Sequence, residues 1–146
     1  MGATMDAYLN GFEDPRRAVF FALSSNGNYR GLRNGHKNGD IFKGDEGLSK
    51  PNIQQGTPYI WMTAAEVFFL RAEGALKQWD MKGTPEALYK SGIRASFEQH
   101  GVKNVENYLV STKVPARYPG FKASPSAPAP SDITVVWNTN LSLIHI

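Results

Sequence analysis

The sequence predicts a mainly α-helical fold built on one antiparallel helical hairpin. Apolar and small residues recur with the helical period through residues 64–79, so one face of that segment is expected to be buried. A second segment with helix start signals, residues 85–100, follows after a short break. The chain of 146 residues is long enough for one domain with a hydrophobic core. Much of its remaining length is rich in glycine, asparagine and proline, which predicts long irregular loops.

The N-terminal part is predicted to form one short helix followed by irregular chain. Residues 3–9 can form a helix that the pair Asn10–Gly11 ends, and Asp14–Pro15 then marks a turn. Residues 18–23 are apolar throughout, which predicts a short buried strand or extended segment. Residues 24–56 contain seven glycines, a composition that suits turns. A loop of this length in a compact domain is expected to be functional or mobile.

The first helix of the hairpin is predicted to begin at Ala64. Thr63 stands three residues before Glu66, which is the spacing of a capping box. Glu73 precedes Lys77 by four residues, so these side chains are expected to pair on the helix surface. Gly83 is the expected C-terminal stop after residue 79. The face with helical spacing comprises Ala65, Phe68, Phe69, Ala72, Ala75, Leu76 and Trp79. We assign four large aromatic residues to the core: Trp61, Phe68, Phe69 and Trp79.

The second helix is predicted to start at Pro85, with Thr84 as its N-cap. His100 lies at the other end, where it complements the negative end of the helix. The small residue Gly92 allows a neighbouring helix to approach closely beside the predicted apolar face, which comprises Tyr89, Ile93 and Phe97. Residues 63–101 should therefore form an αα-hairpin. It is about the size of one tetratricopeptide repeat, although the full consensus of that repeat is not matched.

Less regular structure is predicted for the C-terminal part. Residues 105–110 suit one or two helical turns, and residues 113–131 hold five of the nine prolines, which predicts an extended surface connection. Residues 133–137 suit a strand or extended segment that enters a further element. The last six residues, 141–146, resemble the translation of a sequencing-library adaptor. We expect them to be a non-native tail and exclude them from the fold.

Composition excludes several classes of function. The formal net charge is +3 and the 16 Lys and Arg residues are scattered, which argues against nucleic acid as the partner. The absence of cysteine excludes disulfides, cysteine-bound zinc and a thiol nucleophile. No apolar run is long enough to span a bilayer as a helix. The first residues lack the pattern of a signal peptide, so the expectation is either a cytoplasmic protein or an export signal upstream of residue 1.

Candidate catalytic and metal-binding residues are better explained by structure. Glu66 and Glu73 share one helix face, as a general acid and base could, yet capping accounts for the first and pairing with Lys77 for the second. His36 and His100 are far apart in sequence and show no Ser-His-Asp order. Three acidic residues beside glycines miss the calcium spacing of an EF-hand: Asp40, Asp45 and Glu46. We predict no catalysis, no cofactor and no metal site.

A ligand site is most plausible in the loop of residues 24–56. Sugar binding requires flat aromatic rings against the apolar faces of the ligand, together with polar side chains that bind hydroxyl groups. The loop offers that mixture in Tyr29, Arg30, Arg33, Asn34 and Phe42, which are our candidate ligand-binding residues. The same mixture also occurs in ordinary solvated loops, so the alternative is a loop without function.

The segment from Trp61 to Trp79 resembles the SusD/RagB family of nutrient-uptake lipoproteins. Members show an alanine–glutamate pair, two aromatic or apolar positions and then Leu-Arg-Ala-Glu-Ala-Ala-Leu, and residues 65–76 follow that pattern with Gly74 in place of one alanine. Flanking segments also resemble the family: residues 3–8, 14–16, 88–97 and 133–138. The resemblance runs over most of residues 2–140.

This resemblance implies a SusD-like, mostly helical and tetratricopeptide-based protein exposed at the surface of a Bacteroidetes-type outer membrane. Such proteins are anchored through a lipidated N-terminal cysteine and capture glycans or other nutrients for a TonB-dependent transporter of the SusC type. We expect residues 1–140 to be an incomplete piece of a single SusD-like domain from the C-terminal half of a longer parent protein, with the lipid anchor outside it. Two other functions remain open: a tetratricopeptide-type scaffold that binds a peptide or protein, and a glycan-degrading enzyme.

Overall fold

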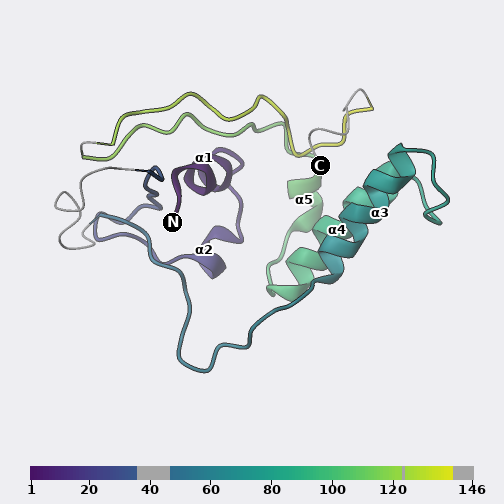
Figure 1. Ribbon diagram of the computed structural model, residues 1–146, viewed down its shortest axis with the longest axis horizontal. Coiled ribbons are helices and arrows are strands. Elements are labelled where there is room, and N and C mark those ends of the chain that lie inside the picture. The colour runs from purple at the N-terminus through teal and green to yellow at the C-terminus, as the bar shows by residue number, and fades with distance from the viewer. Residues whose placement is uncertain (36–46, 123, 140–146) are drawn as a thin grey trace. The chain divides into compact units, whose positions relative to one another are not determined.

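The computed structural model describes residues 1–35, 47–122 and 124–139 (Figure 1). Its helices are α1 (Ala3–Gly11), α2 (Arg17–Phe20), α3 (Ala64–Leu76), α4 (Pro85–Gln99) and α5 (Val105–Leu109). The described parts contain no β-strand, only isolated β-bridges, so the predicted mainly α-helical class is confirmed. The chain divides into two compact units. The first unit comprises Met1–Gln55 and Lys113–Thr134, and the second comprises Gly56–Thr112 and Val135–Ile146.

Helices α3 and α4 form the predicted hairpin, and both begin where their capping residues predict. The Thr63 hydroxyl oxygen accepts a hydrogen bond of 3.0 Å from the backbone N–H of Glu66. The Thr84 hydroxyl oxygen accepts one of 3.2 Å from the backbone N–H of Ala87, and proline follows Thr84 at the first helical position. Each threonine thus satisfies one of the N–H groups that the first helical turn leaves unpaired.

The end of α3 differs from the prediction. The helix ends at Leu76, and Gln78 adopts a left-handed φ of 64°. The N–H of Gln78 donates to the carbonyl of Ala75 and that of Trp79 donates to the carbonyl of Gly74, both at 3.0 Å, which is a Schellman motif. This turn ends the helix well before Gly83. Trp79, expected in the core, lies beyond the helix and is 61% exposed.

The core of the second unit lies between α3 and α4. Ala72, Ile93 and Phe97 are buried there, and the half-buried Phe69 crosses Gly92. A Cβ atom on Gly92 would lie only 2.7 Å from Cε1 of Phe69, so the close approach of the helices requires glycine at this position. The predicted role of Gly92 is therefore confirmed.

The C-terminal segment and α5 complete this core. Residues 133–137 form no strand. Val135 is nevertheless buried, and its carbonyl accepts a hydrogen bond of 2.8 Å from the Tyr89 hydroxyl. The predicted helical turn after residue 104 is confirmed as α5, whose Tyr108 ring lies 5.2 Å from the Phe97 ring. Aromatic residues of α4 thus link this helix to both neighbouring segments, Tyr89 by its hydroxyl and Phe97 by its ring.

The apolar run of residues 18–23 is not the buried strand that its composition predicts. The Asp14 carboxylate accepts hydrogen bonds of 2.9 Å and 3.0 Å from the backbone N–H and the side-chain Nε of Arg16. This local turn starts the short helix α2. The chain after it is extended and pairs with residues 50–52: the N–H of Ala22 donates to the carbonyl of Lys50 and the N–H of Asn52 donates to the carbonyl of Phe20, both at 2.9 Å, on either side of the bridge between Phe21 and Pro51. The run also exposes Val19 and Leu23, so helical turn chemistry overrides its strand-like composition here.

The close contact at Gly92 generates a stability prediction. Gly92→Val should reduce the free energy of unfolding of the hairpin by about 1–3 kcal/mol, because the added methyl groups would overlap the Phe69 ring. Urea unfolding followed by far-UV circular dichroism measures the change. Ala87→Val is the matched control, since it places valine at an exposed position of the same helix. Equal stability of the two variants would contradict the packing argument.

The ion pair between α4 and α5 predicts a pH effect. Arg94 donates hydrogen bonds of 2.8 Å and 3.0 Å to the carboxylate of Glu106, and these bonds lower the pKa of Glu106. Because the folded pKa lies below the unfolded one, the pair stabilises the fold above the unfolded pKa. That contribution is lost as the pH falls through the folded pKa. Arg94→Met should return the pKa of Glu106 towards its ordinary value in an NMR titration, whereas Lys103→Met should leave it lowered.

Candidate functional site

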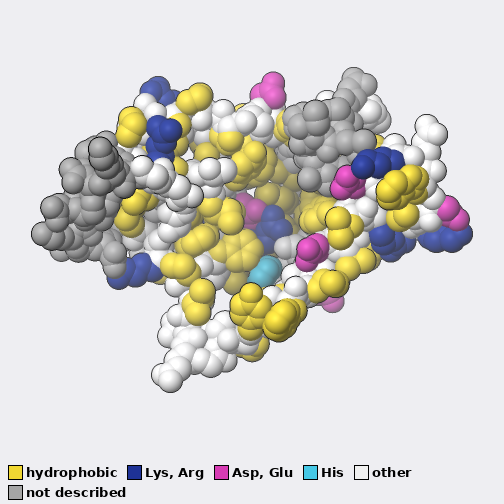
Figure 2. Space-filling view, viewed as in Figure 1, with side chains coloured by type: hydrophobic (Ala, Val, Ile, Leu, Met, Phe, Trp, Pro, Cys, Tyr) yellow, Lys and Arg dark blue, Asp and Glu magenta, His cyan; other side chains and the backbone are white. Residues whose placement is uncertain are grey.

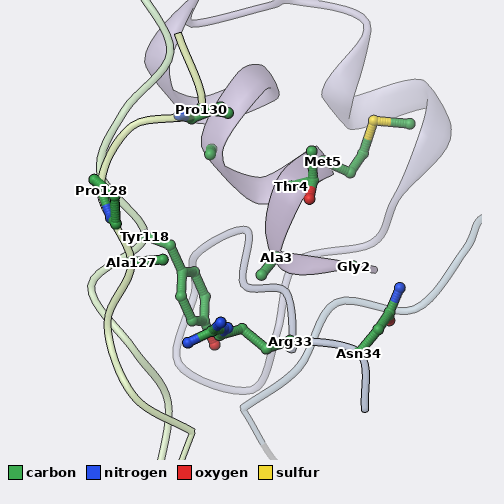
Figure 3. A pocket seen from close by; sticks show the side chains of 11 residues that line it. Gly2, Ala3, Thr4, Met5, Arg33, Asn34, Tyr118, Ala127, Pro128 and Pro130 are labelled. Carbon is green, nitrogen blue, oxygen red and sulfur yellow. The ribbon is translucent and has the colours of Figure 1, made fainter.

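The first unit contains a pocket of about 440 Å³ (Figure 3). Three segments form it: the first turn of α1, the chain at residues 33–34, and the proline-rich segment between residues 118 and 130. Its most informative lining residues are Gly2, Thr4, Arg33, Asn34, Tyr118 and Pro128. The pocket is large enough for a ligand of small-molecule size.

The chain at residues 31–32 is fixed against the start of α1. The N–H of Ala3 donates to the carbonyl of Leu32 at 2.8 Å, and the N–H of Leu32 donates to the carbonyl of Met1 at 3.0 Å. Gly31 lies so close that a Cβ atom there would be 2.5 Å from the carbonyl oxygen of Gly2. Glycine is therefore required at this position, and Arg33, two residues further on, lines the pocket.

The Asp6 carboxylate anchors the same chain from within α1. Asp6 is only 3% exposed, and its oxygens accept hydrogen bonds of 2.6 Å from the N–H of Gly31 and 2.7 Å from Nδ2 of Asn10. Nη1 of Arg30 lies 3.9 Å from the same carboxylate. Hydrogen bonds to an ionised carboxylate are stronger than neutral ones, so Asp6 holds the loop in one conformation.

Tyr118 forms the opposite wall of the pocket. It is 1% exposed, and its hydroxyl donates a hydrogen bond of 3.1 Å to the carbonyl of Gly31. Its backbone pairs with Ala127 through hydrogen bonds of 3.0 Å and 2.9 Å in an antiparallel bridge. Pro115 in the same segment is also buried. The predicted surface connection is thus partly a buried wall, because the bridge folds the segment back on itself.

The structure brings together two of the five predicted ligand-binding residues. Arg33 and Asn34 both line the pocket, and in Figure 3 Arg33 extends towards the Tyr118 side whereas Asn34 lies near Gly2. Tyr29 lies elsewhere: its ring is 5.2 Å from the guanidinium carbon of Arg17. Arg30 serves to position the loop through Asp6. Phe42 lies outside the described residues.

Sequence reasoning missed Tyr118 and the proline wall. The turn residues Pro119 and Gly120, which directly follow this tyrosine in a proline-rich segment, were the available signal that the chain reverses here. Long-range pairing with the loop near Gly31 leaves no local pattern, so this side of the pocket could not be assigned from the sequence.

The pocket is suited to binding an uncharged or acidic polar ligand. Arg33 is the only charged residue among its lining residues, and apolar contact is offered by Pro128 and Pro130. Within the described residues, the side chains of Arg33 and Asn34 have no hydrogen-bond or ion-pair partner, so their donors are available to a ligand. No group of side chains that could hold a metal ion occurs in the described part of the chain.

The two carboxylates considered for catalysis lie on helix α3, and one of them is ion-paired. Glu73 forms an ion pair of 3.3 Å with Lys77, as its spacing predicts. At the capped start of α3 it is the backbone N–H of Glu66 that binds Thr63, and the Glu66 carboxylate has no hydrogen-bond partner among the described residues. Both residues line a shallow groove on α3 rather than the pocket of the first unit. The predicted pairing of Glu73 is thus confirmed, whereas the cap at Thr63 does not involve the Glu66 carboxylate.

The fold places the chain among mainly helical proteins that combine an αα-hairpin with long irregular segments. A family model described as "SusD-like: Susd and RagB outer membrane lipoprotein" matches residues 1–143. The chain belongs to this SusD-like family. The family is one of outer membrane lipoproteins, which confirms the expected outer-membrane location. No helix among the described residues is long and apolar enough to cross a membrane.

Solved structures agree with the family assignment. A SusD homologue from Bacteroides uniformis ATCC 8492 is 38% identical with a TM-score of 0.89, over 97% of this chain and 30% of that one. One from Bacteroides thetaiotaomicron VPI-5482 is 40% identical with a TM-score of 0.88, over 94% and 30%. A chitin-binding SusD homologue from Flavobacterium johnsoniae is 34% identical with a TM-score of 0.84, over 98% and 30%. The chain therefore spans about 30% of the length of these relatives. No curated protein matches it.

The hydrogen bond from Tyr118 to Gly31 predicts a measurable loss of stability. Tyr118→Phe leaves the Gly31 carbonyl without its partner and should lower the free energy of unfolding by about 1–3 kcal/mol. Tyr8→Phe is the matched control, because the Tyr8 hydroxyl has no hydrogen-bond partner in the described structure. Thermal unfolding of both variants measures the difference. If Tyr118→Phe were as stable as the control, the hydroxyl would not hold the pocket wall.

Proposed function

We propose that the parent protein captures glycans at the cell surface and does not chemically alter them. The observation that carries this proposal is the pocket of the first unit, whose lining includes the unpaired donors of Arg33, on the Tyr118 side, and of Asn34, near Gly2. Membership of the SusD-like family and similarity to a chitin-binding relative support the same ligand class.

The chemistry of the pocket matches the needs of a sugar. A pyranose ring presents hydroxyl groups at its edge and C–H groups on its faces. Arg33 and Asn34 can bind hydroxyl or acetamido oxygens, while the exposed rings of Pro128 and Pro130 offer surfaces for the apolar faces. No carboxylate lines the pocket, so the pair of acids that most glycosidases use is missing from this set of lining residues.

We further propose that the captured glycan passes to a SusC-like TonB-dependent transporter, with residues 1–140 forming part of one larger SusD-like domain. The length of the relatives supports the larger domain, since the chain corresponds to about 30% of each. Family membership supports the transporter as partner. The alternative, a tetratricopeptide-type scaffold, requires further helical repeats. The described residues contain a single long hairpin, α3–α4.

The proposal predicts that Arg33 and Asn34 contribute to glycan affinity. Arg33→Ala should weaken binding by about tenfold or more, because a hydrogen bond from a charged group contributes about 1.5–3 kcal/mol. Asn34→Ala should weaken it by a smaller factor. A glycan array that includes chito-oligosaccharides identifies the ligand for the parent protein, and isothermal titration calorimetry then measures each variant.

Lys103→Ala is the charge-matched control, since it removes a positive side chain that belongs to the second unit and is not among the lining residues of the pocket. Affinity of the Arg33 variant equal to that of this control would contradict the assignment of the pocket. Binding to none of the glycans on the array would contradict the ligand class.

A further inference from the structure

Asparagine is followed directly by glycine at three places in the described part of the chain: Asn10–Gly11, Asn26–Gly27 and Asn34–Gly35. A fourth pair, Asn38–Gly39, lies outside the described residues. Such a pair can modify itself, because glycine has no Cβ atom to keep its backbone nitrogen away from the preceding side chain. The reaction requires that this nitrogen and the side-chain amide carbon are free to meet. The three described pairs differ in that freedom.

The first pair, Asn10–Gly11, is held on both sides. Gly11 is the last residue of α1, and the helical backbone directs its N–H along the helix axis and away from the Asn10 side chain. Nδ2 of Asn10 donates to the Asp6 carboxylate at 2.7 Å and to the carbonyl of Tyr29 at 2.9 Å. A Cβ atom on Gly11 would lie 2.1 Å from the backbone nitrogen of Ala116, so the pair is also tightly packed. We expect it to be protected.

The second pair, Asn26–Gly27, is held on one side. The N–H of Gly27 donates a hydrogen bond of 2.9 Å to the carbonyl of Ser24, so the nitrogen that would attack is bonded within a turn. The Asn26 side chain has no hydrogen-bond partner in the described structure. Attack at this pair therefore requires one hydrogen bond to open first.

The third pair, Asn34–Gly35, is held on neither side. Both residues are exposed, and in the structure as described neither the Asn34 side chain nor the Gly35 N–H has a hydrogen-bond partner. Gly35 has a left-handed φ of 77°, and no atom lies within 4 Å of the position that its Cβ would take. The two reacting groups of this pair are therefore free to meet.

We propose that Asn34–Gly35 is a site of spontaneous covalent modification in the lining of the pocket. The backbone nitrogen of Gly35 attacks Cγ of Asn34 and loses its proton, a C–N bond forms, and the side-chain nitrogen leaves as ammonia. Water then opens the resulting succinimide ring at either carbonyl, which gives aspartate or isoaspartate. Water is the only co-reactant, and no atom is oxidised or reduced.

The product differs from asparagine in both charge and hydrogen bonding. The reaction replaces an uncharged amide of the pocket lining with a carboxylate, which only accepts hydrogen bonds where the amide also donates them. Arg33 is the one charged residue of that lining, and the Lys and Arg side chains on the face shown in Figure 2 are scattered without a broad positive patch. The new charge therefore opposes that of Arg33. This consequence for a ligand rests on the proposed function, whereas the reaction itself does not.

Peptide mapping by mass spectrometry tests the proposal, with the three pairs compared within one molecule. The parent protein is incubated in mildly alkaline buffer, both folded and unfolded in urea. In the folded protein Asn34 should be converted about tenfold faster than Asn10 or Asn26, since one hydrogen bond that must open first slows a reaction by about that factor. In urea the three rates should become similar. Equal rates in the folded protein would overturn the proposal.

Two glycine variants identify the attacking nitrogen. Gly35→Ala should slow the conversion of Asn34 several-fold, because a Cβ atom hinders the approach of the nitrogen to Cγ. Gly27→Ala is the matched control and should leave that rate unchanged. Gly27 is also exposed, has a left-handed φ of 71°, and has no atom within 4 Å of its Cβ position, so both substitutions strain the backbone alike. The same rate at Asn34 in both variants would rule out attack by Gly35.

Calorimetry of Asn34→Asp measures the effect on the pocket. In the parent protein this variant should bind glycan several-fold more weakly than Asn26→Asp, which adds the same charge at a residue that does not line the pocket. Equal affinity of the two variants would overturn the predicted effect on the pocket. Conversion of Asn34 is measured by mass in the absence of ligand, so failure of the modification is distinguishable from failure of the glycan proposal.

Discussion

The buried carboxylate of Asp6 is the contact on which the candidate site depends. It lies on the first turns of α1 and accepts the N–H of Gly31 at 2.6 Å and the amide of Asn10 at 2.7 Å. A charge with so little solvent exposure is stable only when its oxygens are bonded, so the loop cannot leave without exposing an uncompensated group. Because Tyr118 donates to the carbonyl of the same glycine, one residue of the loop is held from both sides. Leu32 follows, with its own N–H and carbonyl bonded to the start of α1, and these contacts fix the chain just before Arg33 and Asn34.

Helix starts could be predicted closely because their signals are local. Thr63 and Thr84 cap the residues that their spacing indicates. Helix ends were less predictable, since α1, α3 and α4 all end in the same pair of backbone hydrogen bonds while the left-handed residue differs: Glu13, Gln78 and Gly101. Glycine in the sequence indicates that a helix ends there, whereas glutamate and glutamine do not. Because the left-handed residue that ends α3 is Gln78 and not glycine, the helix was predicted to continue to Trp79.

The candidate site was predictable in part for a similar reason. Loop composition indicated Arg33 and Asn34, because polar residues in a long glycine-rich loop are visible in the local sequence. The same reasoning could not separate them from Tyr29 and Arg30, whose side chains face Arg17 and Asp6 instead. That distinction depends on which way each side chain points after the loop is fixed to α1. Tyr118 is 87 residues from Gly31, so no local pattern could reveal their hydrogen bond.

Helical periodicity identifies a buried face but does not say how many such faces a helix has. The pattern of α3 correctly predicted Ala65 and Ala72 as buried and Phe69 as the residue that meets Gly92. Trp61, which lies outside that pattern, was also assigned to the core, whereas its ring is exposed before the helix begins. That assignment rested on hydrophobicity alone. Hydrophobicity indicates that a side chain is normally buried, but it does not indicate which segment of the polypeptide buries it. Trp61 and Leu70 show the difference, because both are apolar and yet no described segment covers them.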